Sequence, residues 1–273
     1  MLKLFERDIA AADQRLIVLA PANRAIPRSL KNVTQDSDER QDLIHEMQRL
    51  RGSIYLKDGA LTRAQLTADG RHETPEDEKA WHILVTNENR EVTGCIWYLE
   101  HESSPTIDDL RVRNCPLTTQ DEWRDKLRAA VNNEVSRARH DRISYAEVGG
   151  WAVACGSQCV SAALLLILGT YSLSQIAGGA LVLATATVRH SSAKILRRLG
   201  GSHLEGNGYT VPSYYDSRYD CEMELLRFDT RRPTAKYAGL VNMLKGRLAD
   251  VQVIATDSRE GYASSLGFEN AAA

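Results

Sequence analysis

Residues 148–188 read VGGWAVACGSQCVSAALLLILGTYSLSQIAGGALVLATATV and contain no Asp, Glu, Lys or Arg. Such a stretch is compatible with a membrane hairpin or with the buried centre of a soluble α/β domain. Its longest unbroken apolar block, Ala162–Leu168, is far shorter than the ~20 residues that a membrane-spanning helix needs. We therefore predict a buried helix over Ser157–Ile176, a stop at Gly178-Gly179 and a strand over Ala180–Val188 that is covered on both faces.

The residues before this stretch predict a strand, a helix and a hairpin. A short apolar run at Leu16–Leu19 predicts the first strand, and apolar residues at steps of three and four predict a helix over Ser37–Tyr55. Two β-favouring runs, Trp81–Thr86 and Val92–Leu99, are joined by a polar pentapeptide and predict a hairpin. The polar segment between the helix and the hairpin is expected to form a loop.

A second helix and a strand lead into the uncharged stretch. Thr119-Gln-Asp-Glu122 has the pattern of a capping box, and apolar residues then line one face of a helix that ends near His140. The run Tyr145–Val153 predicts a strand that is interrupted by Gly149-Gly150. A glycine pair inside a strand indicates a bulge or the close approach of another group.

The residues after the stretch continue the alternation of strands and helices. The serine pair 191–192 is expected to cap a short helix over Ala193–Leu199. Two strands, His203–Val211 and Cys221–Phe228, and a helix over Tyr237–Leu248 are predicted to follow.

Composition limits the classes of function. The 273 residues carry a formal net charge of −2, so no bulk electrostatic attraction to nucleic acid or to an anionic membrane is expected. We assign residues 1–256 to a single domain. The tail at 257–273 is expected to be disordered, because it has little apolar surface to bury.

The cysteines and the N-terminal segment predict a cytoplasmic protein. The first residues lack the long apolar run and the cleavage site of a signal peptide, and an odd number of cysteines, five, argues against a disulfide framework. Cys155 and Cys159 have no histidine near them in sequence, so we expect no metal site.

Three segments resemble the GNAT superfamily of acyltransferases. Ala193–Gly201, AKILRRLGG, follows a buried strand and resembles the superfamily helix that ends in a Leu-Gly pair. Glu147–Val153, EVGGWAV, and Arg51–Tyr55, RGSIY, are similar to two motifs of the branch that contains acyl-homoserine-lactone synthases and N-acyl amino acid synthases. The resemblance covers about residues 40–230. It implies an α/β fold with a mixed, mostly antiparallel central sheet, flanking helices and a splayed parallel pair of central strands.

The resemblance also implies an activity, namely an N-acyltransferase that moves an acyl group from acyl carrier protein or acyl-CoA to a small amine such as an amino acid. No permanently bound cofactor is expected, because acyl-CoA or acyl-phosphopantetheine is a donor substrate. Glu147 is the expected catalytic residue, since a carboxylate in a largely apolar cleft can accept the proton that the amine loses. The expected donor-binding residues are Trp151, Ala152, Val153, Gln158, Ser161 and Ser191, and the expected substrate-binding residues are Arg51 and Trp97.

These assignments have plainer alternatives. Glu147 could face water or pair with an arginine, and Arg51 could pair with a nearby carboxylate, Asp58 or Glu46. A helix turn that begins near Gln158 needs no ligand at all.

Some positions depart from the patterns of the superfamily. Leu196 stands where a tyrosine commonly acts as general acid, and Gly150 and Trp97 stand where the lactone synthases have arginines. The loss of those arginines argues against S-adenosylmethionine as co-substrate. It leaves two alternatives: a different amine acceptor, or a catalytically silent module that binds acyl thioesters. The tyrosines within Tyr214–Tyr219 either wall an acyl tunnel or lie in surface turns.

Overall fold

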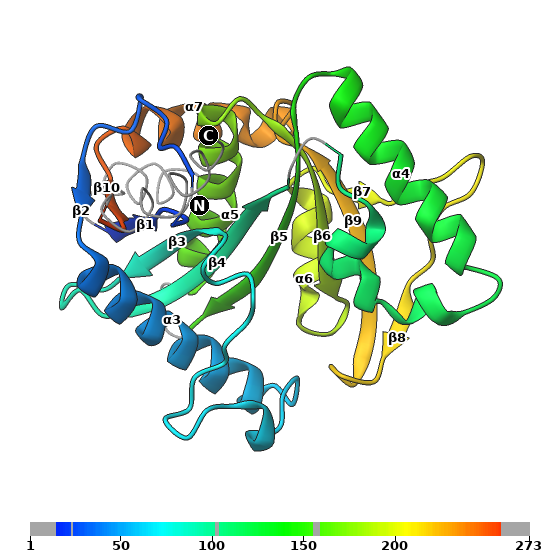
Figure 1. Ribbon diagram of the computed structural model, residues 1–273, viewed down its shortest axis with the longest axis horizontal. Coiled ribbons are helices and arrows are strands. Elements are labelled where there is room, and N and C mark those ends of the chain that lie inside the picture. The colour runs from blue at the N-terminus through cyan, green and yellow to red at the C-terminus, as the bar shows by residue number, and fades with distance from the viewer. Residues whose placement is uncertain (1–14, 23, 102–103, 155–158, 258–273) are drawn as a thin grey trace, which may run out of the picture.

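The computed structural model describes residues 15–22, 24–101, 104–154 and 159–257, which are drawn in colour in Figure 1. These residues form one sheet with helices on both of its faces. The strands are β1 (Leu16–Leu19), β2 (Val33–Gln35), β3 (Trp81–Thr86), β4 (Val92–Glu100), β5 (Ser144–Val153), β6 (Ala180–Thr187), β7 (Ser202–His203), β8 (Tyr214–Asp216), β9 (Cys221–Asp229) and β10 (Gln252–Ala255). The helices are α3 (Ser37–Lys57), α4 (Arg124–His140), α5 (Cys159–Ile176), α6 (Ser192–Arg198) and α7 (Ala235–Leu248).

Within the described residues the sheet has ten strands, in the order β2-β10-β1-β3-β4-β5-β6-β9-β7, with β8 paired to β9. The pairs β5–β6, β1–β10 and β10–β2 are parallel, and the other pairs are antiparallel. The mixed, mostly antiparallel sheet that the sequence predicts is therefore confirmed.

The two central strands, β5 and β6, separate along their length. Their parallel pairing runs from Ser144 opposite Ala180 to Val148 opposite Ala184 and stops there. Both strands continue beyond the paired region, β5 to Val153 and β6 to Thr187. The sheet consequently opens between the C-terminal ends of these strands, which is the splayed pair that the sequence predicts.

A bulge in β5 coincides with this opening. On β4, Cys95 and Trp97 are two residues apart, but their partners on β5, Ala152 and Gly149, are three apart, so β5 carries one extra residue. Gly150 adopts a φ of +62°, a conformation in which glycine is favoured. A Cβ atom on Gly149 would lie 2.3 Å from the Trp97 ring. The glycine pair therefore lets the indole lie directly against the backbone of β5.

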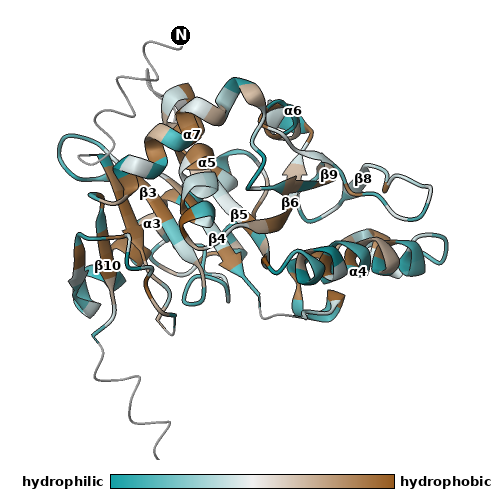
Figure 2. Ribbon diagram, turned by 90° about the horizontal axis from the view of Figure 1, so that it is seen from above, coloured by the Kyte–Doolittle hydropathy of each residue, from teal (hydrophilic) through white to brown (hydrophobic). Residues whose placement is uncertain are grey.

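The helices divide between the two faces of the sheet. We call the face that carries α3 and α4 the front face, and the face that carries α5, α6 and α7 the back face. Figure 2 shows α6 and α7 on the side of the sheet opposite α4. A single large apolar core fills the back face, whereas α3 and α4 each cover a separate apolar cluster on the front face. The space between α3 and α4 lies over β5 and β6.

Helix α5 is the uncharged helix of the back face, and its hydroxyl groups are satisfied internally. Thr170 and Ser172 donate to the carbonyl groups one turn earlier, and Ser174 lies 2.9 Å from the hydroxyl of Thr230. The helix therefore packs its polar side chains inside a protein core. No helix in the described part of the chain is both long enough and apolar enough to span a membrane.

Most of the predicted elements are present, and three predictions are wrong. Thr119 does not cap α4, because it belongs to a 3-10 turn and its hydroxyl donates to the carbonyl of Pro116. Ser191 stands at the N-cap of α6 but makes no side-chain cap hydrogen bond, and Ser192 is the first residue of the helix. The strand predicted over His203–Val211 shrinks to two residues on β9, because the sequence Gly206-Asn-Gly208 turns the chain back on itself.

Three strands were not predicted. Strand β2 is three exposed residues at the edge of the sheet, too short for a periodic signal. Strand β8 is also three residues long. Strand β10 lies between β1 and β2 and is almost fully buried. The predicted tail begins just after it, and residues 258–273 lie outside the described residues.

The contact between Trp97 and the glycine pair predicts that Gly149→Ala destabilises the protein. The added methyl group would overlap the ring, and overpacking of this kind costs about 1–3 kcal/mol. Gly246→Ala is the matched control. Gly246 is a helical position where an added Cβ atom would have nothing within 4 Å, so alanine should stabilise by about 0.5–1 kcal/mol. Urea unfolding of both variants measures the two effects, and equal free energies of unfolding for Gly149→Ala and the parent would contradict the packing.

Candidate functional site

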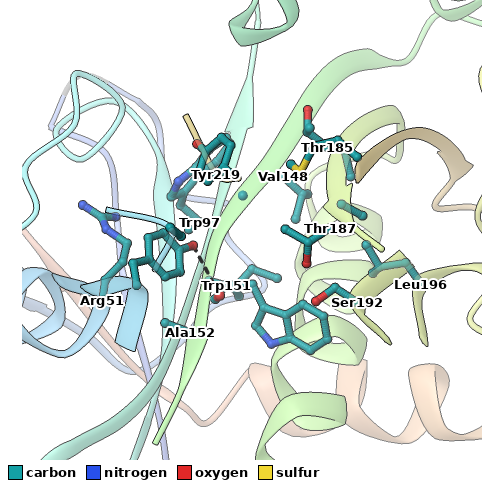
Figure 3. A pocket seen from close by; sticks show the side chains of 18 of the residues that line it. Arg51, Trp97, Val148, Trp151, Ala152, Thr185, Thr187, Ser192, Leu196 and Tyr219 are labelled. Carbon is teal, nitrogen blue, oxygen red and sulfur yellow. Dashed lines mark hydrogen bonds between the residues drawn. The ribbon is translucent and has the colours of Figure 1, made fainter. Parts of the chain in front are cut away.

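The opening between β5 and β6 holds a cavity of about 360 Å³. Glu147 and Trp97 border it from the front face, and Val148 and Leu196 border it from the back face. Because its walls come from both faces, the cavity passes through the sheet. Figure 3 shows Trp97 and Tyr219 on one side of β5, and Ser192 and Leu196 on the other.

Glu147 lies at the cavity with its carboxylate firmly held. The residue is buried, and Oε2 lies 3.0 Å from Nε2 of His101 and accepts from the backbone N–H of Arg111 at 2.9 Å. The other oxygen, Oε1, accepts from the backbone N–H of Val112 at 3.3 Å. The carboxylate therefore neither faces water nor pairs with an arginine side chain. Its contact with Arg111 is through the backbone N–H and not through the guanidinium. An ionised carboxylate has about four lone-pair positions, so one remains for a further donor.

Arg51 has a structural partner that the sequence did not identify. Its Nη1 and Nη2 donate to the two oxygens of Asp77 at 2.9 and 2.7 Å, and Nη2 also donates to the carbonyl of His72. Burial raises the pKa of Asp77, but the hydrogen bonds and charge of Arg51 outweigh it and bring the pKa to about 2. Neither Asp58 nor Glu46 is the partner. The guanidinium fork of Arg51 is therefore already filled by protein.

Trp97 forms the floor of the front half of the cavity. Its indole is buried beneath the glycine pair of β5, and the guanidinium of Arg111 lies 5.4 Å from the ring centroid. Arg111 in turn pairs with Glu76. An indole in this position offers a flat apolar surface with one charged neighbour.

The residues expected to bind the donor divide into three groups. Trp151, Ala152 and Val153 line the cavity. Ala154 donates its N–H to Thr93 on β4, so by the alternation of an extended strand the N–H of Val153 points toward the gap. Gln158 lies outside the described residues. Among the described residues, neither Ser161 nor Ser191 lines the cavity. Ser192, the next residue along the chain, does.

Tyr55, His72 and Arg189 also line the cavity, although the sequence does not assign them to the site. Tyr55 points its hydroxyl at the carbonyl of Trp151, 3.4 Å away, and burial raises the pKa of its phenol. His72 contacts the Tyr55 ring, and burial, aided by the charge of Arg51, lowers its pKa to about 4. Arg189 lies two residues after the end of β6 and also lines the cavity. His72 lies in a polar loop without periodicity, and no signal in the sequence directs the loop toward β5.

The tyrosines of 214–219 have different surroundings. Tyr219 lines the cavity, as a tunnel wall requires. Tyr214 is buried in the apolar cluster under α4, and Tyr215 is exposed. Among the described residues, no group of three His, Cys, Asp or Glu side chains could hold a metal ion.

Comparison with solved structures identifies proteins of similar fold. TofI, in a complex with an inhibitor and MTA, is 11% identical, with 86% of this chain and 99% of that chain covered and a TM-score of 0.51. BjaI, a CoA-dependent acyl-homoserine lactone synthase in complex with SAM and isopentyl-CoA, is 15% identical, with 89% and 93% covered and a TM-score of 0.50. FeeM, an N-acyl amino acid synthase from uncultured soil microbes, is 14% identical, with 72% and 88% covered and a TM-score of 0.45.

No family model and no curated protein sequence matches the chain. At these identities the structural likeness establishes the fold. The predicted GNAT-like architecture is confirmed, and BjaI, a solved acyl-homoserine lactone synthase, is among the proteins of similar fold.

The histidines around Arg51 and Asp77 predict a loss of stability in mild acid. His82 is fully buried with Nε2 2.8 Å from the carbonyl of Asp77, and burial lowers its pKa to about 4. A histidine with a lowered pKa stays neutral in the folded state, so the stability it contributes is complete above the unfolded pKa of ~6.5 and is lost as the pH falls toward 4. His82 alone should cost about 2 kcal/mol between pH 7 and pH 5.

Denaturant unfolding at pH 7 and pH 5 measures this loss, and in His82→Gln the pH dependence should become shallower by that amount. The control is His45→Gln, since His45 contacts Gln41 on the surface of α3. The same pH dependence in the parent and His82→Gln would show that His82 is not the titrating group.

Proposed function

We propose that the protein is an N-acyltransferase that moves an acyl group from a pantetheine thioester to a small amine. The observation that carries the proposal is the cavity through the gap between β5 and β6, with an apolar back half and a front half that contains Glu147. A donor could insert its thioester into the gap from one face of the sheet. The acceptor amine could then reach that thioester from the other face. Acyl-CoA and acyl carrier protein both supply such a thioester.

The back half of the cavity suits the pantetheine arm and the acyl chain of the donor. Its walls include Val148, Ala184, Ala186 and Leu196. The cavity as a whole has a volume of about 360 Å³, which is within the usual range for a small-molecule site. BjaI, which shares this fold, is described in complex with isopentyl-CoA. We infer that the donor here lies in the gap between β5 and β6.

The proposed reaction needs one proton acceptor and one group that polarises the carbonyl. The amine nitrogen forms a bond to the thioester carbon, and the C–S bond then breaks to release the thiol. Glu147, through the lone pair that remains on Oε1, takes the proton that the amine loses, and this proton is returned to the departing sulfur. The N–H of Val153, which points toward the gap, stabilises the oxyanion of the tetrahedral intermediate.

One observation favours a second candidate, a catalytically silent module that binds acyl thioesters. Three donors already occupy the carboxylate of Glu147, and two of them are backbone amides of the turn that begins at Arg111. A carboxylate that holds a turn in place can be kept in a protein that catalyses no reaction. Leu196 also lines the cavity where a general acid would otherwise stand.

A transfer assay with Glu147→Gln separates these two functions. If Glu147 is the base, the variant should lose about 10²–10⁴-fold in the rate of amide formation, because glutamine cannot accept the proton. Mass spectrometry of the amide product, with acyl-CoA and acyl carrier protein as alternative donors and a panel of amines, provides the rate. Thermal shifts with the donor should remain similar in both proteins, because a ligand that binds the folded state raises its melting temperature.

The variant also loses an acceptor for a backbone amide, so both proteins are compared well below their melting temperatures. His72→Asn is the companion variant, since His72 is another proton acceptor in the front half of the cavity. A parental rate in Glu147→Gln would remove Glu147 from the mechanism. Donor binding without amide formation in any protein of the set would identify the silent module.

A further inference from the structure

Arg189 is fixed at the cavity by two backbone groups. Its Nη2 donates to the carbonyl of Asp58 at 2.9 Å and to the carbonyl of Tyr219 at 3.0 Å. Asp58 is the residue that ends α3, and Tyr219 lies in the turn between β8 and β9. The guanidinium therefore bridges two elements of the front face and closes one side of the cavity.

Arg189 forms no ion pair within the described residues. The other two cavity arginines, Arg51 and Arg111, form ion pairs with Asp77 and Glu76. Arg189 has no such pair among the residues that the structure describes, although both of its hydrogen-bond acceptors are identified. Its Nε is buried and has no hydrogen-bond partner in the described part of the chain.

A cavity arginine without an ion pair can bind an anion. The guanidinium has five N–H donors, and within the described residues only Nη2 is engaged. Nη2 uses both of its N–H groups on the two carbonyls, so a bound anion would accept from the remaining N–H groups of the guanidinium and gain a charge-assisted hydrogen bond. A bound carboxylate would supply the ion pair that Arg189 lacks within the described residues.

We propose that Arg189 binds the carboxylate of the amine acceptor, and that the acceptor is therefore an amino acid. This inference rests on the proposed function, since it assigns the anion to the acceptor of an acyl transfer. Arg189 contacts the end of α3 and the turn between β8 and β9 on the front face. Glu147 borders the cavity from the same face. The acceptor would thus have its carboxylate on Arg189 and its amine toward Glu147, while the donor occupies the back half.

The binding test compares an acid with its neutral isostere. N-hexanoyl-alanine and N-hexanoyl-alaninamide resemble the expected product and differ only in the charged group. The parent should bind the acid about 10- to 100-fold more tightly by calorimetry, the range expected for a charge-assisted hydrogen bond in a partly buried site. Arg189→Gln should abolish this preference, and Arg189→Lys should retain part of it, because lysine keeps the positive charge without the planar guanidinium.

Arg218→Gln is the matched control. Arg218 lies beside Tyr219 and pairs with Asp216, outside the cavity lining of the described residues, so its removal changes the net charge equally and should leave the preference intact. Melting temperatures establish that the variants are folded. If Arg189→Gln does not fold, the acid and amide affinities of the parent and of Arg189→Lys decide the question.

Equal affinity of the parent for acid and amide would overturn the proposal, as would a preference that survives in both Arg189 variants. A second binding experiment compares the affinities of pantetheine and phosphopantetheine, two parts of the proposed donor. If Arg189→Gln weakens only the phosphorylated ligand, the anion is the phosphate of the donor and the proposal is wrong.

The outcomes also separate this inference from the transferase function. Equal rates of acylation for alanine and alaninamide would refute the carboxylate site while the transferase stands. Acid binding that depends on Arg189, without amide formation from any amine, would refute the transferase while the carboxylate site stands.

Discussion

The packing of one indole against one strand determines the geometry of the site. Trp97 approaches β5 so closely that neither Gly149 nor Gly150 has room for a side chain. The bulge at this point adds a residue to β5 and turns the strand away from β6. A conventional pairing of the two strands to their ends would close the gap, and the cavity would not exist. The cavity thus lies where the bulge of β5 and the end of its pairing with β6 coincide.

The ion pair of Arg51 and Asp77 supports the opposite wall. It connects α3 to the loop before β3, and Arg51 also donates to the carbonyl of His72 in that loop. A buried pair of this kind is costly to break, because the remaining charge would be left unpaired in the interior. The loop has little apolar surface of its own, so this polar anchor holds His72 beside Tyr55 at the cavity. Stability and site geometry depend here on the same two side chains.

The sequence predicted the order of the central elements because their signals are local. The apolar run of α5, the glycine stops and the helix at Ala193–Leu199 each follow from neighbouring residues, and Glu147 and Trp97 were found from motifs. The partners of these residues could not be predicted, because they are distant in the chain. Asp77 lies 26 residues from Arg51, and Arg189 reaches a carbonyl 131 residues away. Ion pairing within the cavity is a property of the folded chain, and for this reason the sequence points to Arg51 but not to Arg189.

Strand β10 has a consequence for the way the protein is made. It lies between β1 and β2, so one of the last described segments of the chain occupies an inner position next to one of the first. During synthesis from the N-terminus, β1 must wait with one edge unpaired until residues near 252–255 leave the ribosome. An unpaired apolar edge can pair with another chain. The time that the ribosome needs to translate residues 20–255 therefore sets how long this edge of β1 stays unpaired in the nascent chain.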